Sequence, residues 1–77
     1  MVHELKILPR WFNAVAYNHK NFEIRKNDRE FSVGDWLVLC EYEKGRYTGR
    51  AIERQIEYIY YGDGTFGLLK GWCVLGF

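Results

Sequence analysis

The chain has 77 residues, of which 48% are apolar and 27% are charged, and its formal net charge is +1. This composition excludes a disordered chain, and the length allows one domain with a single small core. The near-zero net charge does not indicate a strong polyanion binder, and the spacing of the two cysteines fits no zinc or redox motif.

The N-terminal residues are not expected to form a targeting segment. The stretch MVHELKILPR lacks the apolar core of a signal peptide, and no apolar run reaches the roughly 20 residues of a membrane helix. We therefore expect a cytoplasmic protein with no membrane contact, in which Cys40 and Cys73 are buried free thiols. His3 and His19 have no partners at metal-ligand spacing, so structural roles, no metal and no cofactor are expected.

The first predicted elements are a short strand over residues 3–8 and a helix over residues 9–18. Pro9 suits the first helical position, where its missing N–H is not needed. The apolar side chains at helical spacing are Phe12, Val15 and Ala16. Asn18 is expected to end the helix, because Asn tolerates the left-handed backbone conformation.

A second strand is predicted over residues 20–26, where apolar and polar side chains alternate. Phe22 and Ile24 are expected to face the core. Glu23 and Arg25 then point to the opposite face, because successive side chains of a strand alternate.

The later elements, in chain order, are a turn over 27–30, a strand over 36–42, a hairpin loop over 43–49, a strand over 50–61, a turn over 62–67 and a strand over 70–77. The strand over 36–42 is apolar on both faces and is expected to be central. The core-facing side chains expected in the strand over 50–61 are Ile52, Ile56 and Tyr58. Arg54 and Ile59 interrupt that alternation.

About five strands and one early helix predict a mainly β, α+β fold in a single domain over residues 1–77. Sequential antiparallel strands in so short a chain favour a small, partly closed β-barrel, since closure protects sheet edges. No internal repeat or linker divides the chain.

Charged side chains gather around the second strand: residues 5–29 carry six basic and two acidic side chains. Lys20 is expected to reach Glu23 and Arg25 from the junction between helix and strand. Lys20 and Arg25 would then hold phosphate or carbonyl oxygens, and Glu23 would accept from a base amine. The alternative is a solvated face with a surface Glu23–Arg25 ion pair.

Several residues near this charged strand have more than one possible role. Lys6 either extends the basic site or is solvated, and Tyr17 either stacks on a base or packs in the core. For Trp11, core packing is favoured over stacking. Arg50 follows the hairpin loop, where it could also touch a phosphate. Asn27 and Asp28 are turn formers rather than ligands.

The segment NHKNFEIR, residues 18–25, resembles the ASCH-domain motif G-x-K-x-x-E-x-R. Lys20, Glu23 and Arg25 match the motif, and Asn18 stands where the motif has Gly. The segments HELKILP, FEIRKNDREFSVGD, EYE and YTGR also resemble a bacterial and phage family of small ASCH-like proteins. The resemblance covers about residues 3–60.

This resemblance implies a PUA-like β-barrel in which the motif lines a cleft between the first helix and the barrel. It favours a module that binds RNA or a nucleotide-like ligand. One alternative is a small amidohydrolase acting on an N4-acylated cytidine, with Lys20 and Glu23 catalytic; in such enzymes, however, a Thr stands at the position of Glu23. Another is a non-catalytic accessory protein that works through protein contacts.

Overall fold

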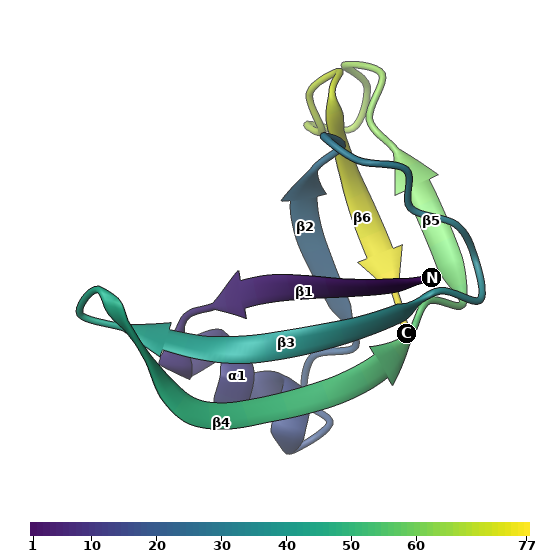
Figure 1. Cartoon of the computed structure of the whole chain (residues 1–77). Coiled ribbons are helices and arrows are strands. Elements are labelled where there is room, and N and C mark those ends of the chain that lie inside the picture. Colours follow the sequence, from purple (N-terminus) through teal and green to yellow (C-terminus); the bar gives the residue numbers. More distant parts are fainter.

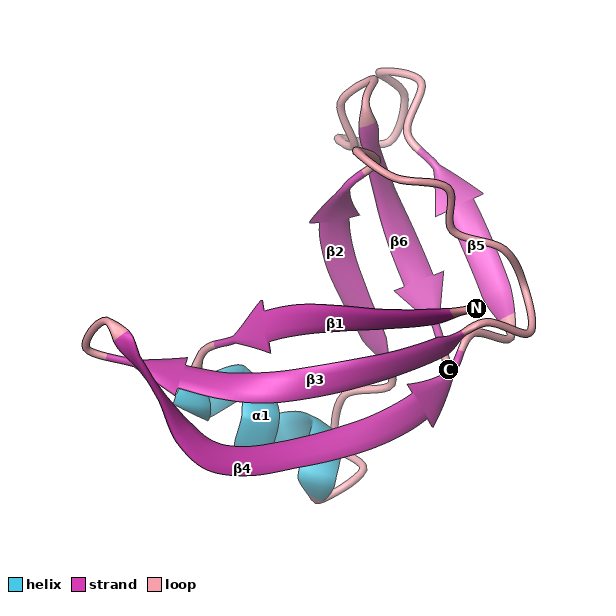
Figure 2. Cartoon of the chain, viewed as in Figure 1, coloured by secondary structure: helices cyan, strands magenta, loops and turns pink.

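The computed structural model describes residues 1–77 and contains six strands and one helix (Figures 1 and 2). The elements are β1 (Val2–Ile7), α1 (Pro9–Ala16), β2 (Phe22–Lys26), β3 (Trp36–Glu43), β4 (Arg46–Gln55), β5 (Tyr58–Tyr61) and β6 (Trp72–Gly76). This confirms the mainly β fold with one early helix. No helix is long and apolar enough to span a membrane.

The strands form two separate three-stranded sheets, with orders β1-β3-β4 and β2-β6-β5. In Figure 1 the two sheets lie at a steep angle to one another, and α1 covers one face of the first. Neither sheet closes on itself into a barrel. β3 is the central strand of its sheet, as its apolar sequence predicts.

The expectation that all neighbouring strands are antiparallel is wrong for β1, which pairs with β3 in parallel. Parallel strands need a crossover connection, which is usually helical. Here the connection contains α1, which packs against β3, and also β2, which leaves to join the other sheet. The early helix therefore provides the crossover that allows the parallel pair.

The helix begins at Pro9, as predicted, and ends at Ala16, two residues before the predicted bound. Pro9 occupies the first helical turn. Asn18 has a φ of 60°, and its N–H donates to the Val15 carbonyl at 3.0 Å. A residue in this left-handed conformation terminates a helix and satisfies its last carbonyls.

The strand predicted over 50–61 is two strands that belong to different sheets. The chain passes from β4 to β5 at Ile56, whose N–H donates to the Asp35 carbonyl and whose carbonyl accepts from Gly34, both at 2.8 Å. Beyond this point the alternation changes phase: Ile59 is buried and Tyr58 is exposed, the reverse of the expectation for Tyr58. Ile59, which interrupts the sequence pattern, marks the break.

The hairpin turn is shorter than the predicted loop over 43–49. Lys44 and Gly45 alone connect β3 to β4, and both have positive φ angles, 51° and 80°. Positive φ at both central residues defines the two-residue turn that matches the twist of paired strands. The residues after Gly45 therefore continue the ladder as β4.

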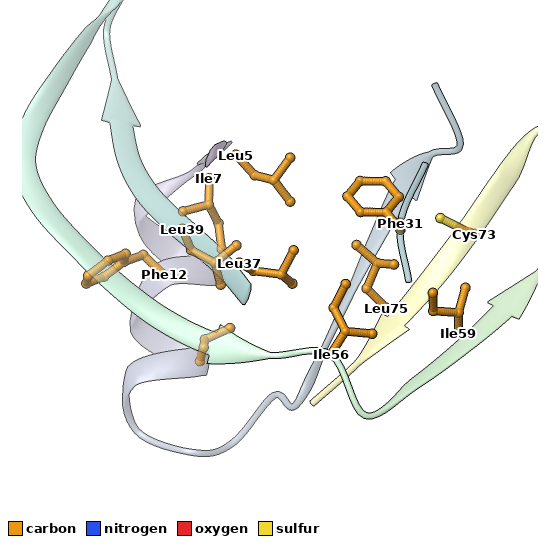
Figure 3. Close-up of a cluster of buried hydrophobic side chains, with 11 residues drawn as sticks. Leu5, Ile7, Phe12, Phe31, Leu37, Leu39, Ile56, Ile59, Cys73 and Leu75 are labelled. Carbon is orange, nitrogen blue, oxygen red and sulfur yellow. The ribbon is translucent and has the colours of Figure 1, made fainter. Parts of the chain in front are cut away.

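The hydrophobic core lies between the two sheets and under α1 (Figure 3). The first sheet and α1 contribute Leu5, Ile7, Phe12, Val15, Leu37 and Leu39, and the rest of the chain contributes Phe31, Ile56, Ile59, Cys73 and Leu75. Cys73 is a buried free thiol, as expected, whereas Cys40 is only partly buried. Neither sheet has a core of its own, so each depends on the other.

His3 has the structural role expected for it. Its ring is buried, with Nε2 at 2.8 Å from Asp35 Oδ2 and a ring centroid 4.7 Å from that of Phe31. The hydrogen bond to His3 is the main cause that holds the pKa of the Asp35 carboxyl below its usual value. This contact ties β1 to the turn that precedes β3.

The expected orientation of β2 is wrong. Phe22 is 38% exposed and Ile24 is 50% exposed, whereas Glu23 is only 5% exposed. The strand thus presents Glu23 and Arg25 to the interior and Phe22 and Ile24 to solvent. Glu23 can be buried because cations compensate its charge, as described below.

Truncating Ile56 and Ile24 to alanine tests whether Ile56 lies in the core and Ile24 faces solvent. Ile56→Ala should lower the free energy of unfolding by about 2–5 kcal/mol, because Ile56 is 1% exposed and its loss leaves a cavity. Ile24→Ala should lower it by about 1 kcal/mol or less, because that side chain is half in solvent. Urea denaturation measures both values. Equal losses would show that Ile24 faces the core after all.

Candidate functional site

The side chains of Lys20, Glu23 and Arg25 converge at the start of β2. Lys20, in the loop after α1, donates from Nζ to Glu23 Oε1 and, at 2.8 Å, to the Phe22 carbonyl. Arg25 donates from Nη2 to Glu23 Oε2 at 3.1 Å. Each oxygen of the buried carboxylate therefore faces its own cation.

Arg25 has a second partner that explains its position. Its Nη2 also donates to the backbone carbonyl of Lys6, at the end of β1, at 2.5 Å. The guanidinium therefore links the two sheets through β1 and β2. This geometry excludes a solvated Glu23–Arg25 surface pair, because the carboxylate is buried and both cations are mostly covered.

A pocket of about 430 Å³ opens beside this cluster and is lined by Trp11, Lys20, Phe22, Glu23 and Ile24. The volume falls within the range of small-molecule sites. The Lys20 ammonium lies 5.0 Å from the centre of the Phe22 ring and 5.6 Å from that of Trp11. Aromatic and apolar walls thus enclose one polar corner made by Lys20 and Glu23.

The polar corner retains hydrogen-bonding capacity. An ammonium has three N–H donors, and two of those of Lys20 are used within the chain. Each oxygen of Glu23 accepts one hydrogen bond and has a further lone pair. The pocket can therefore donate to and accept from the polar edge of a flat ligand held against its apolar walls.

Comparison with known proteins places the chain in a family. A family model described as a domain of unknown function (DUF3850) matches residues 2–77. The chain belongs to the DUF3850 family. It is also 40% identical over 55 residues to an uncharacterized 12.9 kDa protein in the GpA 3′ region of Escherichia phage P2, a match that covers 71% of this chain and 50% of that protein. The chain spans about half the length of this phage relative.

In this DUF3850 domain the other predicted site residues lie outside the pocket. Arg25 lies behind Glu23 and does not line the cavity. The Lys6 ammonium lies 4.5 Å from the centre of the Tyr42 ring, on another surface. Tyr17 is exposed and lies near His19, with ring centroids 6.3 Å apart. Of the residues predicted to bind ligand, Lys20 and Glu23 line the pocket.

For three pocket residues the sequence predicts a place in the core: Trp11, Phe22 and Ile24. Trp11 is 41% exposed, so the expectation of core packing is wrong. Alternation in β2 separates two faces but does not say which is inward. The close spacing of Lys20, Glu23 and Arg25 carries a further signal, because three charges that compensate one another can be buried and can thus set the inward face of the strand.

A second buried carboxylate belongs to Glu41, in the β3 strand of the β3–β4 hairpin. Arg50 donates two hydrogen bonds to this carboxylate, from Nε to Oε1 at 2.9 Å and from Nη2 to Oε2 at 2.6 Å. Thr48 Oγ1 donates a third, to Oε1 at 2.6 Å. Arg50 Nη2 also donates to Asn13 Oδ1 at 3.0 Å, so it joins the hairpin to α1. Arg50 is thus engaged in holding the fold together.

Replacing Glu23 tests whether its charge is required inside the DUF3850 domain. Glu23→Gln should lower the free energy of unfolding by about 3–5 kcal/mol, because it leaves Lys20 and Arg25 covered and without a counter-charge. Glu53→Gln, which removes one carboxylate from the surface of β4, is the matched control. Chemical denaturation of the two variants gives the comparison, and similar small losses would contradict the buried charge cluster.

Acid should weaken the contact between the hairpin and α1. The hydrogen bonds from Arg50, and then that from Thr48, lower the pKa of Glu41 from 4.5 to about 2. Because the folded pKa is below the unfolded one, this contribution is complete above pH 4.5 and is lost as pH falls towards about 2.

Unfolding measured as a function of pH checks this. Glu41→Gln should flatten the fall in stability over that pH range, leaving a remainder to which Asp35 contributes, since its pKa is also lowered. A variant whose stability falls with acid as steeply as that of the unaltered domain would show that Glu41 does not carry the effect.

Proposed function

We propose that this DUF3850 domain binds RNA or a nucleotide-like ligand and that its pocket holds one nucleobase. The observation that carries the proposal is that Trp11 and Phe22 flank the Lys20–Glu23 pair in a single cavity. Stacking on aromatic rings accounts for much of the affinity for unpaired bases. Hydrogen bonds from and to the polar corner would then select among base edges.

The structure changes the roles suggested by the sequence. Arg25 is bound to Glu23 and to the Lys6 carbonyl, so we assign it to positioning Glu23 rather than to phosphate. Lys20 remains the one cation that lines the pocket. Its free donor would meet a carbonyl or phosphate oxygen, and Glu23 would accept from an exocyclic amine.

The PUA-like assignment belongs to the same proposal. In PUA-like domains the ASCH motif lines a cleft beside the first helix, and here Lys20 and Glu23 line a pocket to which Trp11 of α1 also contributes. We place binding ahead of amide hydrolysis, because none of the five residues that line the pocket carries a hydroxyl or a thiol for nucleophilic attack.

Replacing pocket residues tests the proposal. Lys20→Met keeps the aliphatic stem and removes the charge, and Trp11→Ala removes a stacking surface. Each should weaken binding of single-stranded RNA or of a nucleoside monophosphate at least about fivefold, since a charge-assisted hydrogen bond or one stacked base contributes about 1–3 kcal/mol. Calorimetric titration at two salt concentrations gives the affinities.

The matched control is Lys44→Asn, which removes the same charge from the hairpin turn with a residue that tolerates a positive φ. It should bind as the unaltered domain does. The affinity for RNA should fall only slightly as salt is raised, because a single cation that is already paired releases few counterions from the RNA. Full affinity in both pocket variants, or no binding by any of the proteins, would refute the proposal.

A further inference from the structure

A second surface continues the pocket across the β2-β6-β5 sheet. One face of this sheet packs inward, where Phe31 lies over Cys73 and Leu75 (Figure 3). The residues of alternate parity point away from the core. These outer-face residues are Phe22, Ile24, Lys26, Tyr58, Tyr60, Trp72, Val74 and Gly76.

The strand register arranges the outer face in rows. Phe22, Gly76 and Tyr58 form one row, and Ile24, Val74 and Tyr60 form the next. Gly76 has no side chain, so the first row has a gap between the rings of Phe22 and Tyr58. Tyr58 is 66% exposed, and the remaining apolar members of the set are each at least partly exposed.

The charge on this surface favours an anionic ligand. Lys26 is the one charged side chain of the outer face, and no carboxylate belongs to it. The outer side of the other sheet is different, because Glu4 and Glu53 lie on either side of Val38. Both surfaces carry aromatic rings, but only the β2-β6-β5 surface combines them with positive charge alone.

The outer face and the pocket share residues. Phe22 and Ile24 line the pocket and also belong to the outer face. A nucleic-acid strand with one base beside Lys20 could therefore pass over Phe22 towards Tyr58 without crossing a polar barrier. The two surfaces form one continuous path.

We propose that the outer face is a stacking platform for the nucleotides next to the one in the pocket, so that the domain binds single-stranded nucleic acid and not merely a free nucleotide. This inference rests on the function proposed above. Exposed aromatic rings on a sheet stack unpaired bases in RNA-binding domains, typically two or three of them. Tyr58 and Trp72 supply such rings here, and Lys26 supplies a contact for phosphate.

The test compares a nucleoside monophosphate with a single-stranded RNA nonamer of mixed sequence, each titrated against the full chain. Tyr58→Ala should weaken binding of the nonamer at least about fivefold and leave the monophosphate unchanged, because it removes a stacking ring outside the pocket. Tyr58→Phe should bind both as the unaltered domain does. Tyr47→Ala, an exposed Tyr on the other sheet, is the matched control and should change neither affinity.

The outcomes separate the two proposals. Suppose that Lys20→Met weakens binding of both ligands, that the nonamer binds no more tightly than the monophosphate, and that Tyr58→Ala has no effect. The platform proposal is then refuted, and the pocket proposal stands. If neither ligand binds, both proposals fail. If sedimentation shows a dimer that Tyr58→Ala dissociates while RNA affinity is unchanged, the outer face is a contact between copies and the platform is again wrong.

Discussion

The buried carboxylate of Glu23 is the constraint on which the site depends. An isolated charge in a protein interior is strongly unfavourable, and this one is tolerated because Lys20 and Arg25 each bind one of its oxygens. Once Glu23 points inward, the alternation of β2 turns Phe22 and Ile24 outward. The apolar wall of the pocket is therefore a consequence of burying a charge.

The same cluster depends on how the two sheets are joined. Arg25 reaches the carbonyl of Lys6 in β1, so Glu23 is held by a contact that crosses between the sheets. The chain crosses between them again at Ile56, which is hydrogen-bonded to Gly34 and Asp35. In a domain this small, one shared core and these polar links fix the angle between the sheets, and with it the distance between Trp11 and β2.

The sequence predicts well what local chemistry decides. Pro9 and Asn18 limit the helix, and the apolar run of β3 indicates a central strand, because these signals act within a few residues. It fails where tertiary contacts decide. The inward face of β2 depends on whether Glu23 finds cations inside, and the parallel pairing of β1 depends on where the crossover packs. Lys20 and Glu23 are found from their spacing, but Trp11 and Phe22 are not, since large aromatic residues usually lie in cores.

The charge balance of the site bears on the ligand proposed for it. Lys20 and Arg25 carry two positive charges and Glu23 one negative charge, so much of the field that a phosphate would meet is already neutralised. A bare phosphate would also leave the rings of Trp11 and Phe22 without a partner. A flat group with donors and acceptors on one edge uses both the rings and the polar corner. The proposed recognition of a base, with phosphate contacts left to exposed cations such as Lys26, therefore agrees with the near-neutral charge of the whole chain.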